Sequence, residues 1–430
     1  MNTPTSRSAV LALLLAVAGC QNLRPVEPAP PAPPPPPPIE EPLATHRFEF
    51  DPAVDEVIGQ IQVTRVQGED TLSDIARRFN LGYEEIVRAN PGVDPWLPGE
   101  GREIVLPTQF VLPDAPREGV VINLAQLRVF YFPKAKKDEP RTVITHPIGI
   151  GKVGWATPMG TTKVTAKAKD PAWFPPASVR KEHAAAGDPL PRRVPPGPDN
   201  PLGTRKLTLG WPSYLMHGTN KPYGVGMRTS HGCIRFYPED IEQIYDLIPV
   251  GTKVTVVNQP FVFGWHDDAL YVQAFPILED DEREHPTAAG ALLNAAISDA
   301  MWRKIKEHGA SVDLDLINAT VAEPRGIALP VSRAGLSLDG YLSDARRVEN
   351  RVPDGANWDG KDELLVTAEE YEERTGTAPK QATPSAAPAK QSAPKQAAPK
   401  QSVVKPTARK EAAGKETTAA GSTRAAAGVR

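Results

Sequence analysis

The stretch Ser230-His231-Gly232-Cys233-Ile234-Arg235 places a cysteine two residues after a histidine. A second histidine stands sixteen positions before the cysteine, in His217-Gly218-Thr219-Asn220. A cysteine attacks a carbonyl only as the thiolate, so a catalytic thiol needs a base or a positive charge nearby. The two motifs therefore predict a nucleophilic Cys233.

Either histidine is a candidate for the base. His217 directly follows the apolar residues Leu215-Met216. A strand that ends here would position the polar ring of His217 as a base. His231 lies two residues from Cys233, and residues i and i+2 share one face of an extended strand. The alternative interpretation is structural, with a core histidine at 217 and a surface loop histidine at 231.

The thiol of Cys233 is predicted to have no disulfide partner. The only other cysteine, Cys20, follows the apolar run Ala9 to Ala18 and Gly19. Ten apolar residues are too few to span a membrane, and small residues before a cysteine are typical of a processing site. A core helix with a chance cysteine is the alternative. Residues 1–20 resemble a bacterial lipoprotein signal, which implies lipidation at Cys20, export to the periplasm and, with Gln21 next, anchoring to the outer membrane.

Composition varies strongly along the 430 residues. Residues 21–58 form a Pro-rich linker whose proline run favours extended polyproline II, a semi-rigid spacer. Residues 375–430 carry ten basic and two acidic side chains and almost no large apolar ones, which predicts a disordered basic tail. Because the whole chain has a net charge of −3, residues 1–374 carry −11. An acidic body argues against a nucleic-acid enzyme.

Residues 59–108 are predicted to form a small α+β module of strand, helix, helix and strand. Thr71 and Asp74 suggest a helix N-cap. A helix-turn-helix is the alternative, but flanking strands are not part of that motif. The segment resembles a LysM module, which implies binding of glycans that contain N-acetylglucosamine, through the loops Gly68 to Thr71 and Asn90 to Gly92.

Residues 117–258 are mainly β in pattern. The runs Val120 to Leu124 and Leu127 to Phe132 predict a hairpin around Ala125-Gln126, although Ala-Gln is poor turn chemistry. Pro238 to Leu247 is the only good helix, with proline at its first position. The Pro-rich excursion 170–204 is expected to cover a cleft.

Residues 266–374 form a C-terminal region to which the sequence assigns no chemistry. Leu270 to Ala274 predicts a strand, and the apolar face from Ala288 to His308, which includes Trp302, predicts one helix.

The motifs around Cys233 resemble those of the YkuD-type L,D-transpeptidases, with support from Ile148-Gly149 and Thr157-Pro158-Met159-Gly160-Thr161. The resemblance implies a mainly β catalytic domain, sandwich-like or barrel-like, and a cysteine-dependent acyltransferase with no metal and no organic cofactor. It implies Cys233 as nucleophile and His217 as base, oriented by the carbonyl of Gly218. The other implied site residues are Gly232 and Cys233 as oxyanion donors, His231 beside them, and Arg235, Ser230, Asn220 and Tyr223 as substrate-binding residues.

The implied reaction is acyl transfer on peptidoglycan. A thioester forms on the tetrapeptide stem, D-Ala leaves, and an amine resolves the thioester. A second diaminopimelate would give a 3-3 cross-link, and a lysine of an outer-membrane lipoprotein would attach that protein to the wall. Because a LysM module precedes the catalytic domain, the chain most resembles the periplasmic subgroup that attaches the major outer-membrane lipoprotein to the wall. Two alternatives stay open: a carboxypeptidase or hydrolase with water as acceptor, and a non-catalytic wall-binding lipoprotein.

Overall fold

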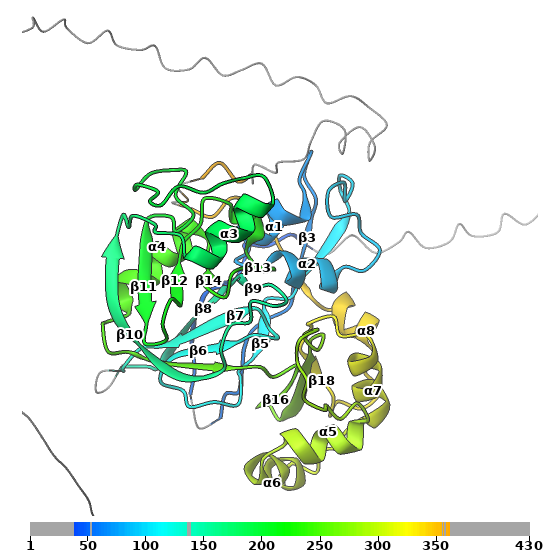
Figure 1. Cartoon of the computed structure of the whole chain (residues 1–430). Helices are drawn as coiled ribbons and strands as arrows, with labels where there is room; N and C mark the ends of the chain where they lie inside the picture. The colour runs from blue at the N-terminus through cyan, green and yellow to red at the C-terminus, as the bar shows by residue number, and fades with distance from the viewer. Residues whose placement is uncertain (1–37, 52–53, 136–138, 355, 357, 362–430) are drawn as a thin grey trace, which may run out of the picture. The chain divides into compact units, whose positions relative to one another are not determined.

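The computed structural model describes residues 38–51, 54–135, 139–354, 356 and 358–361, which belong to one compact unit (Figure 1). The predicted signal, with Cys20, and the predicted tail 375–430 lie outside the described residues. None of the described helices has the length and apolar character needed to span a membrane.

A nine-stranded sheet forms the framework, in the order β1-β8-β7-β6-β15-β10-β11-β12-β14. Apolar side chains of these strands and of α4 share one core. The mainly β fold class predicted for residues 117–258 is confirmed. The strands of this sheet are β1 (Arg47–Glu49), β6 (Gly119–Asn123), β7 (Arg128–Phe132), β8 (Thr142–Pro147), β10 (Gly160–Lys169), β11 (Arg205–Leu209), β12 (Leu215–His217), β14 (Ile234–Arg235) and β15 (Lys253–Val257).

Smaller elements surround the end of the sheet that carries β12 and β14. The two-stranded pair β9 (Ile150–Gly151) and β13 (Arg228–Ser230) leads into the cysteine loop. Helix α4 spans Pro238–Leu247, as predicted, with proline in its first turn. The excursion 170–204 holds α3 (Ala177–Ala185), and η1 (Pro222–Gly224) precedes β13.

The predicted hairpin is present as β6 and β7, but its turn is longer than predicted. Leu124 to Leu127 form the turn instead of Ala125-Gln126 alone. Leu127 adopts a φ of 53°, which supplies the left-handed residue that Ala-Gln cannot provide easily. Asn123 Nδ2 donates to Gln126 Oε1 at 2.9 Å, and this buried hydrogen bond stabilises the turn.

The module that resembles LysM has the predicted order β3 (Gln62–Arg65), α1 (Leu72–Arg78), α2 (Tyr83–Ala89) and β4 (Glu103–Leu106). Thr71 and Asp74 form a capping box at the start of α1, in agreement with the sequence. Strands β3 and β4 pair antiparallel, so the helix-turn-helix alternative is wrong. A short antiparallel ladder flanks it in sequence, with β2 (Val57–Gly59) before the module and β5 (Gln109–Val111) after it.

The C-terminal region is packed against this module. Strand β19 pairs in parallel with β3, so the sheet of the module has the order β19-β3-β4. Helices α5 to α7 lie beside β16 and β18 in Figure 1, and they share a core with Ile61 and Val63. The elements of this region are β16 (Phe261–His266), β17 (Ala269–Ala274), α5 (Ala289–Ala296), α6 (Asp299–Glu307), α7 (Leu314–Ala322), β18 (Leu329–Pro330), α8 (Leu338–Ser343) and β19 (Arg346–Arg347).

Two predictions for this region have different outcomes. The strand at residues 270–274 is confirmed as part of β17. The single helix from Ala288 to His308 is wrong, because Ser298 interrupts it and caps α6 by accepting a hydrogen bond from the Met301 N–H. Met301 and Ile305 of the predicted apolar face are buried, but Trp302 is exposed.

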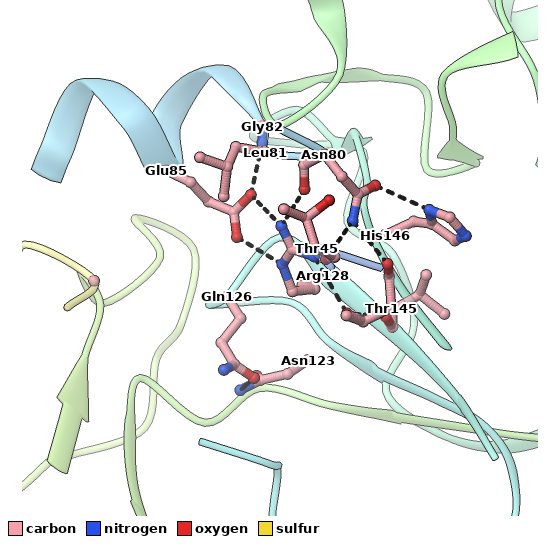
Figure 2. Close-up of polar contacts among 12 residues, drawn as sticks. Thr45, Asn80, Leu81, Gly82, Glu85, Asn123, Gln126, Arg128, Thr145 and His146 are labelled. Atoms are coloured by element: carbon pink, nitrogen blue, oxygen red, sulfur yellow. Dashed lines mark hydrogen bonds and ion pairs between the residues drawn. The ribbon is translucent and has the colours of Figure 1, made fainter. Parts of the chain in front are cut away.

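A buried ion pair joins the module to the nine-stranded sheet (Figure 2). Arg128, on β7, is fully buried and donates to both carboxylate oxygens of Glu85, on α2, at 2.7 and 2.9 Å. The same guanidinium donates to the Asn80 carbonyl at 2.7 Å and lies 4.0 Å from the Phe110 ring centroid. The Nε and Nη2 groups of Arg128 are thus directed at the module, while Nη1 donates to Thr145 Oγ1 on β8 of its own sheet at 3.3 Å.

We predict that Glu85→Ala lowers the free energy of unfolding by about 3–5 kcal/mol, since it leaves the Arg128 charge buried without a counterion. Glu84→Ala on the same helix is the matched control. Its ion pair with Arg88 is partly exposed, with side-chain exposures of 35% and 22%, so its loss should cost about 1 kcal/mol or less. Urea unfolding of both variants checks this, and equal costs would contradict it.

Candidate active site

The pairing of two short strands brings the predicted nucleophile and base to the same face. Strands β12 and β14 are parallel neighbours, with Met216 opposite Ile234 and His217 opposite Arg235. Paired residues point to the same side of a sheet and alternate along each strand. Met216 and Ile234 accordingly point into the core and are fully buried. His217, Arg235 and the preceding Cys233 therefore share the other face.

The His217 ring is held in one tautomer. Its Nδ1 lies 2.6 Å from the Gly218 carbonyl oxygen, which can only accept, so Nδ1 carries the proton and Nε2 keeps its lone pair. Burial lowers the pKa of His217 to about 3, and the Arg235 charge acts in the same direction. The imidazole is neutral at neutral pH, as a general base must be.

The Cys233 thiol rests in its neutral form. It donates to the Ser213 carbonyl at 3.6 Å, and Ser213 itself has a φ of 70°. Burial raises the pKa of Cys233, while the Leu215 N–H and the Arg235 charge act against this rise. The neighbours thus favour the thiolate, but burial dominates before substrate arrives.

The loop before the thiol is tightly constrained. Gly232 has a φ of 98°, and a Cβ there would lie 2.8 Å from the Tyr214 ring. Its N–H donates to Ser230 Oγ at 3.1 Å, and Ser230 Oγ donates to the Cys233 carbonyl at 2.5 Å. Thr157 Oγ donates to the Gly232 carbonyl at 2.9 Å. The Gly232 N–H is therefore already bound to Ser230 Oγ, which is buried within the loop. To donate to an oxyanion, this N–H would first have to break its hydrogen bond to Ser230.

Arg235 is a partly buried cation whose charge is not matched by an acidic side chain among the described residues. Its Nη1 donates to Thr229 Oγ at 3.3 Å, while its buried Nε has no hydrogen-bond partner there. The Cys233 and Tyr223 side chains are close enough to affect its pKa, which burial lowers. A cation in this setting can receive an anionic group of a substrate.

His231 contacts residues that the sequence did not identify. Its Nε2 lies 3.1 Å from Glu182 Oε2 on α3, and Trp155 packs edge-on at 4.8 Å between ring centroids. Glu182 also forms an ion pair with Lys152. Burial lowers the pKa of His231, and Glu182 opposes this. The excursion 170–204 thus covers this side of the site, but it has no periodicity from which Glu182 could have been found.

The remaining predicted site residues lie on the segment that leads to β13. Asn220 is exposed and donates to the Asp199 carbonyl at 3.3 Å, and Tyr223 lies in η1. Within the described ranges, no group of three or more His, Cys, Asp or Glu side chains is arranged to hold a metal ion. Loops Gly68 to Thr71 and Asn90 to Gly92 include buried Asp70 and Asn90, whose polar atoms are engaged within the protein, Asp70 by Arg78 and Asn350 and Asn90 by Val105.

Comparison with known proteins gives two domain matches. The L,D-transpeptidase catalytic domain (YkuD) matches residues 117–256, and the LysM domain matches residues 64–107. The probable L,D-transpeptidase YcfS of Escherichia coli K12 is 37% identical over 262 residues, which cover 60% of this chain and 81% of that protein. YbiS of the same strain is 44% identical over 47% of this chain and 66% of its own length. ErfK/SrfK of that strain is 33% identical over 66% and 90%.

We predict that the pH midpoint for alkylation of Cys233 by iodoacetamide lies above that of an exposed cysteine, because burial disfavours the thiolate. Arg235→Gln should move the midpoint further up, since it removes a charge that stabilises the thiolate. Arg333→Gln, which changes an arginine near Tyr271, is the control and should leave the profile unchanged. A midpoint that falls in Arg235→Gln would refute the electrostatic assignment.

Proposed function

Because the chain belongs to the L,D-transpeptidase family, whose members are cysteine-dependent acyltransferases of peptidoglycan, we propose that Cys233 carries the acyl group and His217 moves the protons. The observation that supports this most is the β12–β14 register, which puts the thiol, the imidazole and the Arg235 guanidinium on one face. The fixed tautomer of His217 supports the same roles, since its free lone pair is on Nε2.

Proton transfer and thiol attack occur together in this proposal. With a pKa of about 3, His217 does not hold the thiol proton at rest. As Sγ bonds to the carbonyl carbon at stem position three, its proton passes to His217 Nε2. The bond to D-Ala then breaks, and the leaving amine takes that proton. An acceptor amine next attacks the thioester, gives a proton to Nε2, and the released thiolate recovers it.

Arg235 is proposed to bind a carboxylate of the peptide stem. The stem is anionic, and a guanidinium can hold a carboxylate through two parallel hydrogen bonds. Its free buried Nε is available for one of them. A bound carboxylate would also weaken the effect of the Arg235 charge on His217 and raise the pKa of that base when substrate is present.

The proposed acceptor is an amine, either diaminopimelate of a second stem or a lysine of an outer-membrane lipoprotein. Water is the alternative acceptor and would make the protein a carboxypeptidase or hydrolase. Each acceptor uses the same thioester. The LysM module binds the glycan strand and keeps donor stems near Cys233.

Localisation is a separate part of the proposal. The small residues before Cys20, and a thiol at Cys233 without a second described cysteine, support a lipid anchor in the periplasm, on the outer membrane. With Cys20 acylated, the given sequence would offer Cys233 no second thiol with which to form a disulfide in that oxidising compartment.

Incubation of the soluble protein with tetrapeptide muropeptides should add the stem mass minus D-Ala to Cys233, as seen by mass spectrometry. Cys233→Ala should show no adduct. His217→Gln should slow acylation by about 10²- to 10⁴-fold, since a general base contributes that much. His308→Gln, an exposed histidine of the C-terminal region, is the control. An adduct that persists in Cys233→Ala would exclude this nucleophile.

The same assay identifies the acceptor. A second stem peptide, a lysine-ended lipoprotein peptide and buffer alone are added to the isolated acyl-enzyme, and the product masses are compared. Release at the same rate in all three would favour the hydrolase alternative.

We predict that Cys20→Ser moves the protein from the membrane to the soluble fraction of cells and abolishes incorporation of radiolabelled fatty acid. Cys233→Ser should keep both properties. Labelled fatty acid on the Cys20→Ser variant would contradict the proposed anchor.

A further inference from the structure

We propose that the N-terminal end of α2, in the LysM module, is a positioning element of the active site. Gly82 and Tyr83 hold the loop residues Val225 and Gly226, and this loop sets the place of the segment that ends at Cys233. The module then contributes to the chemical step in addition to binding glycan. The inference rests on the function proposed above.

The contact between the two segments is backbone against backbone. A Cβ on Gly82 would lie 2.6 Å from Gly226 Cα, and a Cβ on Gly226 would lie 2.3 Å from Gly82 Cα. The Tyr83 N–H donates to the Val225 carbonyl, and the Glu84 N–H donates to the Gly226 carbonyl, each at 3.2 Å. Only glycine at both positions permits this approach.

The loop is connected directly to the thiol segment, since Gly226 is seven residues before Cys233. The Met227 carbonyl accepts from the Ile150 N–H at 3.0 Å, and the Ser230 carbonyl accepts from the Lys152 N–H at 2.9 Å. A Cβ on Gly151, between these two partners, would lie 3.0 Å from Gly232 Cα. A shift of the loop would therefore displace the β9–β13 pair and the residues beside the thiol.

The α2 end is itself held firmly. Glu85 accepts the Gly82 N–H at 2.6 Å while it binds Arg128, as Figure 2 shows. Arg128 belongs to β7, in the sheet of the catalytic domain. The loop at Val225 and Gly226 therefore contacts a helix end that is itself bonded to β7 of the catalytic sheet. This gives the contact between loop and module a defined geometry.

Two pairs of variants test the contact. Gly82 has a negative φ, so Gly82→Ala adds the clash without backbone strain, and Gly82→Ser adds the same Cβ together with a helix-capping hydroxyl. Gly290→Ala, at a helical glycine with open space around it, is the control. Tyr83→Pro removes the N–H at the first helical position, where proline is tolerated, and Tyr83→Ala removes the same ring but keeps the N–H.

The donor is a tetrapeptide without sugar, so glycan binding does not contribute. We expect Gly82→Ala, Gly82→Ser and Tyr83→Pro to lower kcat by about tenfold to a hundredfold, the range that small misplacements of reacting groups produce. KM should change less, and the pH profile of Cys233 alkylation should shift. Gly290→Ala should match the wild type, and Tyr83→Ala should retain most of its turnover.

Unfolding midpoints are measured for every variant, and kcat is compared only among folded proteins. If Gly82→Ala does not fold, Tyr83→Pro against Tyr83→Ala decides. Wild-type kcat on the sugar-free donor in the folded clash variants, with a defect only on glycan-linked muropeptides, would overturn the inference and leave the module a glycan tether. Rescue by Gly82→Ser would assign the defect to helix capping and overturn it too. A wild type that forms no thioester would instead refute the proposed function.

Discussion

The buried ion pair of Arg128 and Glu85 is the interaction on which the arrangement of this chain depends. A charge placed in a protein interior is tolerated only when its hydrogen-bonding groups are matched, and Arg128 is matched by Glu85 and Asn80 of another module together with Thr145 of its own sheet. The pair therefore stabilises one relative placement of sheet and module and penalises others. Because Glu85 also accepts the Gly82 N–H, the same carboxylate fixes the end of α2 that meets the active-site loop.

The active site depends on a second constraint, the parallel pairing of β12 and β14. These strands have three and two residues, and neither would be stable alone. Met216 and Ile234 hold them to the core from one side, so the other side presents His217 and Arg235 with little freedom. Burial that secures this geometry also keeps the thiol and the imidazole neutral. The same burial that fixes the positions of Cys233 and His217 therefore disfavours the reactive thiolate.

Local signals explain what could be predicted from the sequence. Pro238 marks the start of α4, Thr71 and Asp74 mark α1, and two short motifs bring Cys233 and His217 to attention. Contacts that depend on distant parts of the chain left no such signal. Glu182 reaches His231 from an excursion without periodicity, and Gly82 meets Gly226 because two backbones approach closely, which neither glycine reveals by itself. The shared apolar face of its flanks predicts one continuous helix through Ser298, whereas in the structure Ser298 caps α6.

The parallel pairing of β19 with β3 has a consequence for how the protein is made. Strand β3 emerges from the ribosome early, but its neighbour on one side, Arg346–Arg347, is synthesised about 280 residues later. Until then one edge of the module exposes unpaired backbone groups, which are able to pair with other chains. Completion of the module therefore waits until the C-terminal region has been synthesised, and a nascent chain that stops after the catalytic domain would carry that open edge.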